Sequence, residues 1–119
     1  MAKDDYDTIV FKILLYLYAV LKRKIVFDEQ SFYHAIGFKN IDEDYFINIL
    51  YMMYEDGLID DIVLKKAWGS TYILCSDLND MTITANGIHY LNDNKKMNKI
   101  REYLLSNVDT IASLINLCI

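Results

Sequence analysis

The side chains best able to do chemistry in this sequence are two histidines and two cysteines, and they lie far apart. His34 and His89 fall on different predicted helices, so we expect no metal site around either, because a metal ion needs several converging ligands. Cys75 lies in a predicted apolar strand, where a thiol is usually inert packing, and it forms no Cys-X-X-Cys motif with Cys118. These residues therefore predict neither a metal centre nor a nucleophile.

Phosphate and calcium chemistry are also disfavoured by the sequence pattern. The four glycines are scattered singly, so no glycine-rich loop is available to hold a phosphate. The acidic clusters 42–44 and 60–61 lack the alternating ligands and the bidentate glutamate of a calcium loop, and solvated helix ends explain them better. We therefore predict a protein that is not an enzyme and that binds no metal or cofactor.

The composition predicts one small domain with a large apolar content. The chain has 119 residues, of which 54% are hydrophobic, and this length supports a core without disulfides. The apolar run 9–21 is interrupted by Lys12 and closed by the basic residues 22–24, so it is too short to cross a membrane. Because the segment 1–7 is acidic, it does not resemble a secretory signal, and we expect a cytoplasmic protein.

Helical spacing predicts three helices in the first half of the chain. The first, at about residues 5–22, has a core face and a second apolar stripe on its other side. The core face comprises Val10, Ile13, Leu14, Leu17 and Leu21, and the second stripe comprises Phe11, Leu15 and Tyr18. The second helix runs from an N-cap at Asp28 to Ile36, with Gly37 at its C-terminal end.

The third predicted helix begins near Asp42 and stops at Gly57. Negative charge in its first turn is favoured by the helix dipole. Its apolar residues fall on one side and predict a core face of Phe46, Ile49, Leu50 and Met53. The same phase predicts an outward side of Asp44, Ile47, Asn48, Tyr51 and Glu55.

The second half predicts a hairpin and then further helices. Residues 58–65 and 71–75 are β-branched or aromatic runs separated by a loose tip at 66–70. Thr84 is the predicted N-cap of a helix that carries Ile88, Tyr90 and Leu91. The final segment has apolar residues at steps of three and four, a spacing typical of helix packing: Met97, Ile100, Leu104, Val108, Ile111, Ile115 and Cys118.

Three helices followed by a hairpin is the element order of a winged helix. We predict an α+β winged-helix fold, with a three-helix core and a β-hairpin wing, over residues 1–94 and a C-terminal helix over residues 95–119. That helix either covers the second stripe of the first helix in its own chain or pairs with a second copy, and we favour a homodimer. The candidate dimer residues are Phe11, Leu15, Tyr18, Leu104, Val108, Ile111 and Ile115.

Three segments resemble the YjcQ-like family of small bacterial and phage proteins. They are DYDTIVFKILLYL at 5–17, YMMYEDGLIDD at 51–61 and MTITANGIHYL at 81–91 with the following NDNKKMNK. The resemblance implies a winged-helix fold and a frequent phage or prophage origin, with no established activity or catalytic residue to carry over. The strongly apolar end at 111–119 departs from the typical short member.

Nucleic-acid binding is the main alternative function, because the third helix of winged-helix proteins commonly enters the major groove. Here the range 41–56 holds five acids and no lysine or arginine, which opposes docking against phosphates. A DNA-binding regulator would therefore use the wing and the C-terminal lysines. Its candidate residues are Asn48, Lys65, Lys66, Lys95 and Lys99, with Lys96 as a further basic neighbour.

Protein binding fits the predicted surface better than DNA binding. Ile47 and Tyr51 on the third helix and Trp68 at the wing tip are large side chains at exposed predicted positions. Such residues are common centres of interface energy. We therefore predict a non-enzymatic regulatory or adaptor protein that contacts an unidentified protein and a second copy of itself, with no membrane and no small-molecule partner.

Overall fold

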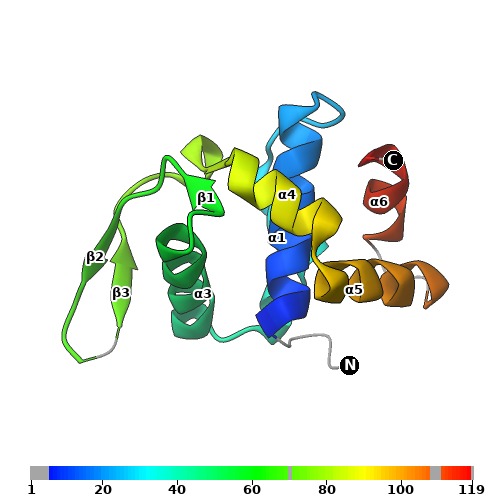
Figure 1. Ribbon diagram of the computed structural model, residues 1–119. Helices are drawn as coiled ribbons and strands as arrows, with labels where there is room; N and C mark the ends of the chain where they lie inside the picture. The colour runs from blue at the N-terminus through cyan, green and yellow to red at the C-terminus, as the bar shows by residue number, and fades with distance from the viewer. Residues whose placement is uncertain (1–5, 70, 108–110, 119) are drawn as a thin grey trace.

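The computed structural model describes residues 6–69, 71–107 and 111–118. Within these ranges the chain forms an α+β structure with six α-helices, two short 3-10 helices and four short strands (Figure 1). Helix α1 lies at the centre, with the β2 and β3 strands on one side beyond α3 and with α5 and α6 on the other side (Figure 1). None of the helices in the described ranges combines the length and apolar content that a membrane crossing requires.

Helix α1 (Tyr6–Leu21) is buried around most of its circumference. It packs against α2, α3, α4, α5, α6 and β4, so both of its predicted apolar stripes are covered by the same chain. The prediction was wrong for Leu21, whose side chain is 54% exposed. Leu21 ends the helix, and the chain then turns through Arg23, which has a left-handed φ of 59°.

Helix α2 (Glu29–Ile36) begins at its predicted N-cap, Asp28, and α3 (Glu43–Glu55) begins next to Asp42, as predicted, which confirms those two predictions. The side chain of Asp28 accepts a hydrogen bond from the backbone N–H of Ser31 at 2.9 Å, and Asp42 accepts one from Tyr45 at 3.2 Å. The hydrogen bond from Ser31 lowers the pKa of the Asp28 carboxyl below its usual value. Gly37 adopts the predicted left-handed conformation, with a φ of 70°, and leads into η1 (Phe38–Asn40).

The rotation of α3 about its axis is the one that its sequence predicts. The four residues assigned to the core are all buried: Phe46, Ile49, Leu50 and Met53. Phe46 also joins an aromatic cluster with Phe32 and Phe38, whose ring centroids lie 6.3 Å and 5.2 Å from its own. Since the core face is correct, the opposite face of α3 carries its acidic side chains, as predicted.

The strands form two separate antiparallel pairs. Strand β1 (Ile59–Asp60) pairs with β4 (Thr82–Ile83), and β2 (Leu64–Lys66) pairs with β3 (Tyr72–Leu74). The predicted continuous strand over 58–65 is therefore broken, because Asp61 has a left-handed φ of 56°. The Thr82 hydroxyl donates a 2.7 Å hydrogen bond to the Asp61 carboxylate and so ties this turn to β4, a strand that the sequence did not predict.

Helix α4 (Ala85–Asp93) starts at the predicted N-cap, Thr84, after η2 (Leu78–Asp80). The Thr84 side chain accepts a 2.9 Å hydrogen bond from the backbone N–H of Gly87. Gly87 is packed so closely on the chain that a Cβ there would overlap the carbonyl oxygen of Leu58. Only glycine fits at this crossing, which holds the start of α4 against the β1–β4 pair.

The C-terminal segment forms two helices, α5 (Lys95–Ser106) and α6 (Ala112–Cys118), whereas the sequence predicted one. Polar side chains end α5, since the Ser106 hydroxyl and the Asn107 amide both donate to the backbone carbonyl of Tyr103, at 3.1 Å and 2.8 Å. Such local bonds compete with helix continuation. Both helices nevertheless pack on α1.

Candidate functional site

The β2–β3 hairpin has an inner face that packs on α3. On this face Leu64 and Leu74 pair across the strands, and both are half-buried against the core. The ring of Tyr72 stacks on the ring of Tyr51 from α3, with centroids 4.0 Å apart and planes at 15°. Hydrogen bonds to the side chains of Glu55 and Tyr72 raise the pKa of Tyr51 above its usual value. This tyrosine pair therefore attaches the hairpin to α3.

The outer face of the same hairpin has no described segment packed on it. Val63 is 51% exposed, Ile73 is 55% exposed, and Lys65 pairs directly with Ile73 across the strands. Trp68 at the tip is 97% exposed, the largest exposed fraction among the large apolar side chains of the described residues. We call Val63, Ile73 and Trp68 the hairpin patch. A hairpin that exposes a tryptophan and two aliphatic side chains is the kind of surface that partner proteins cover.

Cys75 lies next to this patch and corrects the sequence prediction for its thiol. The residue follows the last position of β3 and its side chain is exposed, whereas the sequence predicted a thiol packed within a strand. Its Sγ lies 3.6 Å from the carbonyl oxygen of Ile73. The strand ends one residue earlier than predicted, and Cys75 belongs to the outer face of the hairpin, which is why it remains in solvent.

The three predicted protein-contact residues do not form one open surface. Trp68 is fully exposed, but Tyr51 is half-buried beneath Tyr72, and Ile47 is half-buried against the core. Asn48 is also partly covered, and its Oδ1 is buried with no hydrogen-bond partner among the described residues. The prediction that this side of α3 faces solvent was therefore wrong in part, and at Tyr51 the inner face of the hairpin covers it.

The candidate nucleic-acid residues divide between two distant parts of the molecule. Lys65 and Lys66 are exposed on β2, and Lys95 and Lys99 are exposed on α5. Helices α3 and α1 lie between these two elements (Figure 1). The structure does not bring the wing lysines and the C-terminal lysines together, so no single basic surface contains both groups.

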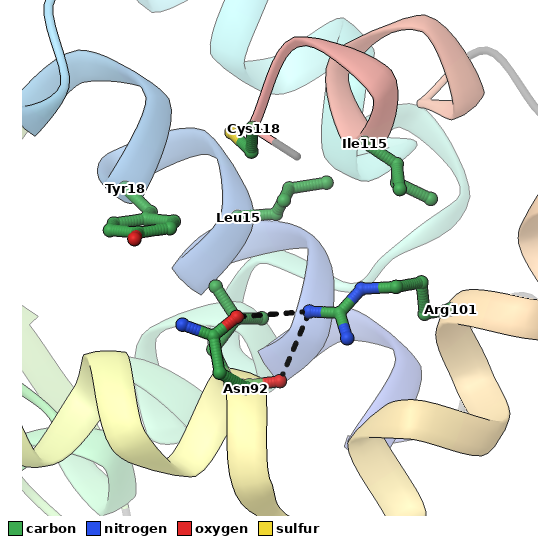
Figure 2. Close-up of a pocket in the computed structure, with 7 residues that line it drawn as sticks. Leu15, Tyr18, Asn92, Arg101, Ile115 and Cys118 are labelled. Atoms are coloured by element: carbon green, nitrogen blue, oxygen red, sulfur yellow. Dashed lines mark hydrogen bonds between the residues drawn. The ribbon is translucent and has the colours of Figure 1, made fainter.

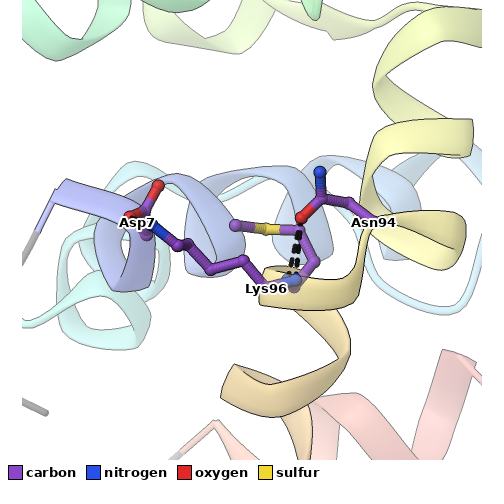
Figure 3. A network of polar contacts seen from close by, with 4 residues as sticks. Asp7, Asn94 and Lys96 are labelled. Atoms are coloured by element: carbon purple, nitrogen blue, oxygen red, sulfur yellow. Dashed lines mark hydrogen bonds and ion pairs between the residues drawn. The ribbon is translucent and has the colours of Figure 1, made fainter.

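Lys96, the further basic neighbour, is engaged within the chain. Its Nζ lies 3.0 Å from the Asp7 carboxylate, and this ion pair joins the start of α5 to the start of α1 (Figure 3). Asn94 caps α5 at the same place, since its Oδ1 accepts hydrogen bonds from the backbone N–H groups of Lys96 and Met97 at 2.9 Å and 3.2 Å (Figure 3). These contacts fix the position of the start of α5 relative to α4 and α1.

Most of the predicted dimer residues are buried inside a single chain. Five of the seven are no more than 1% exposed: Phe11, Leu15, Leu104, Ile111 and Ile115. Tyr18 is half-buried, and Val108 lies outside the described residues. The apolar stripe of α1 that led us to expect a second copy is therefore covered by α5 and α6 of the same chain.

A small cavity of about 150 Å³ remains where α1, α4, α5 and α6 meet (Figure 2). Its lining residues are Leu15, Tyr18, Leu91, Asn92, Arg101, Ile115 and Cys118. The Arg101 guanidinium donates hydrogen bonds to Asn98 Oδ1 at 2.9 Å, to the Leu91 carbonyl at 3.2 Å and to Asn92 Oδ1 at 3.3 Å. Because these acceptors belong to the chain itself, Arg101 serves to hold α4 and α5 together.

The two histidines lie apart and outside any ligand cluster among the described residues. His89 Nδ1 lies 3.6 Å from the carboxylate of Asp93, one helical turn along α4. We overlooked this pair in the sequence, although the spacing of four residues shows it. The two side chains are 73% and 75% exposed, and such solvated pairs contribute little to stability. Burial raises the pKa of the Cys118 thiol, which disfavours the reactive thiolate.

This arrangement defines an α+β protein. Its helices enclose α1, and its hairpin presents an uncovered apolar face. The chain belongs to the YjcQ family, whose model, described as YjcQ protein, matches residues 11–108. This confirms the resemblance found in the sequence. The match includes the hairpin and α5 and ends before α6. No curated protein and no solved structure matches the chain.

Proposed function

We propose that this protein is a non-enzymatic regulatory or adaptor protein with a winged-helix fold, which binds another protein through its hairpin patch. The observation that carries the proposal is the 97% exposure of Trp68 on a hairpin that also leaves Val63 and Ile73 half-exposed. Tryptophan is enriched among the residues that dominate binding energy. A partner that covers this side chain would gain a large apolar contact, since an aromatic residue buries about 150–250 Å².

The element order supports the winged-helix part of the proposal. Helices α1, α2 and α3 precede the β2–β3 hairpin, and β1 pairs with β4 at the base of that hairpin. In this interpretation β2 and β3 are the wing, and α3 occupies the position of the recognition helix. The phage or prophage origin and the cytoplasmic location implied by the sequence remain predictions, as does self-association.

The acidic charge of α3 and the packing of the hairpin on that helix favour a protein partner over DNA for this surface. The described residues of α3 carry Glu43, Asp44 and Glu55 but no basic side chain, so the helix would repel phosphates. Its Tyr51 side is occupied by the wing itself. A DNA contact by the hairpin would then depend on Lys65 and Lys66 alone. Two lysines are few compared with the phosphate contacts of typical DNA-binding proteins.

The proposal is tested by capturing partners from the native host with wild-type protein and with Trp68→Ala. We expect the variant to lose a partner that the wild type retains, while circular dichroism shows an unchanged fold. Val26→Ala is the matched control, because Val26 is 88% exposed but lies in the loop after α1, away from the hairpin. Equal capture by all three proteins would contradict the proposal. So would salt-sensitive binding of mixed duplex DNA that Lys65→Glu with Lys66→Glu abolishes.

A further inference from the structure

The register of the hairpin determines which backbone groups of β2 remain available. Val63 accepts a hydrogen bond from Cys75 N–H at 2.7 Å, and Ala67 donates one to the Thr71 carbonyl at 2.9 Å. In an antiparallel pair, hydrogen-bonded positions alternate with non-bonded ones. Lys65 is therefore bonded to Ile73, whereas the N–H and C=O groups of Leu64 and Lys66 point away from β3. Strand β3 contacts α3 and lies between that helix and β2 (Figure 1), so the free edge of β2 is turned away from α3.

The side chains around this edge combine positive charge with apolar surface. Lys65 and Lys66 are adjacent and exposed, and neither forms an ion pair among the described residues. Val63 and Leu64 precede them and are apolar, at 51% exposed and half-buried respectively. Trp68 follows at the tip. Along the strand, this edge therefore carries two apolar side chains followed by two cationic ones. Each face of the strand has one apolar and one cationic side chain.

We propose that β2 binds an extended segment of a partner protein as an added antiparallel strand, in which two acidic residues are followed by two apolar ones. Antiparallel pairing places the acidic residues opposite Lys66 and Lys65 and the apolar residues opposite Leu64 and Val63. Opposite charges in directly facing positions stabilise a strand pair. This inference rests on the proposed function, because it names the kind of segment that the hairpin binds.

Charge opposes the symmetric pairing of two copies of β2 that is centred on Lys65. Two copies of β2 paired antiparallel about a two-fold axis at Lys65 would place Lys65 directly opposite itself, and like charges that face each other are destabilising. Edge lysines are a common protection against such unwanted pairing. The same lysines favour an acidic segment, so charge complementarity argues for a partner strand over a second copy of β2.

The test uses the full chain and the synthetic peptide acetyl-Thr-Asp-Glu-Ile-Val-Thr-amide. We expect saturable shifts of the Leu64 and Lys66 amide signals in nuclear magnetic resonance spectra, together with a change in the emission of Trp68, the one tryptophan of the chain. Lys65→Glu with Lys66→Glu should weaken binding by about tenfold through the lost cross-strand charge pairs. A peptide with Lys-Lys in place of Asp-Glu should bind correspondingly worse than the acidic one.

Backbone methylation of the peptide provides a matched pair of controls. In the proposed pairing the Asp and Ile N–H groups point toward β2, whereas those of Glu and Val point away. N-methylation at Asp and Ile should therefore reduce affinity roughly tenfold or more, because two backbone hydrogen bonds are lost. N-methylation at Glu and Val should change it little. Equal binding of both methylated peptides, or no shift at Leu64 and Lys66, would overturn strand addition.

These outcomes are separate from those of the proposed function. If Trp68→Ala loses its partner while both methylated peptides bind equally, the hairpin binds by side chains alone and only strand addition is wrong. If the acidic peptide shifts Leu64 and Lys66 with the expected methylation pattern but Trp68→Ala retains all partners, strand addition stands and the role of the tip is wrong.

Discussion

The two ends of this molecule differ in whether their apolar side chains are buried or exposed. On one side of α1, the helices α5 and α6 cover Phe11 and Leu15 so that both are essentially inaccessible. On the other side, the hairpin leaves Ile73 and Trp68 in solvent. Both regions have strongly apolar sequences, so hydrophobicity alone does not distinguish them. The difference shows that an interface is identified by which apolar face the chain leaves uncovered.

Geometry explains why the hairpin end stays uncovered. A two-stranded sheet has two faces, and the inner one is used to pack Tyr72, Leu64 and Leu74 toward α3. The outer face would need another layer, and no described element lies on it. Isolated two-stranded hairpins are marginally stable in water, so this hairpin depends on its contact with α3. Its outer face is left for a partner.

The largest expected effect comes from Phe11→Ala. The Phe11 ring is fully buried, and the Arg101 guanidinium carbon lies 5.6 Å from its centroid. Removing a buried phenylalanine ring typically lowers the free energy of unfolding by about 3–5 kcal/mol. Urea denaturation followed by circular dichroism measures this change. A loss below about 1 kcal/mol would mean that α5 and α6 do not cover α1 in the isolated chain.

A smaller loss is expected for Ile115→Ala in α6. Ile115 is 1% exposed and lines the cavity beside Leu15. Truncating a buried isoleucine costs about 2–5 kcal/mol, and we expect the lower part of this range because the neighbouring cavity already reduces packing. The same denaturation experiment measures it at several protein concentrations. Stability that rises with protein concentration would indicate that α6 is covered by a second copy.

The attachment of the hairpin is tested by a double-mutant cycle on Tyr51 and Tyr72. The stacked rings should give a coupling energy of about 0.5–1.5 kcal/mol between Tyr51→Ala and Tyr72→Ala. Thermal denaturation of the wild type, the two single variants and the double variant supplies the four values required. Strictly additive losses would show that the hairpin does not rest on α3, and the contrast between its two faces would then disappear.

The smallest effect on stability is expected for Trp68→Ala. The side chain is almost fully exposed and contacts no core residue, so the free energy of unfolding should change by less than about 0.5 kcal/mol. In the wild type, acrylamide should quench the tryptophan emission nearly as well as that of free indole. Strong protection from acrylamide in the isolated protein would mean that the tip folds back onto the chain.

The sequence predicted local features well because their causes are local. Asp28, Asp42 and Thr84 cap the helices that follow them, and side-chain type and position decide such caps. The buried side of α3 follows from the spacing of its apolar residues. The resemblance to the YjcQ family rests on three short segments and is confirmed over most of the chain.

The features that the sequence did not predict depend on contacts between distant segments. Strand β4 has only two residues, too few to show a strand period, and it is defined by its pairing with β1. The partial burial of Tyr51 requires knowing that the hairpin folds onto α3. The choice between covering the α1 stripe in the same chain and pairing with a second copy likewise depends on where α5 ends, which Ser106 and Asn107 decide.

Amide hydrogen exchange of the isolated protein, resolved by residue, tests the contrast between the two ends most directly. We expect the Leu64 and Lys66 amides at the open edge of β2 to exchange rapidly, Lys65 between them to exchange more slowly, and Ile100 and Leu104 in α5 to exchange slowest. Rapid exchange throughout α5 together with protection of Leu64 and Lys66 would contradict the account, because the covered and uncovered surfaces would then be reversed.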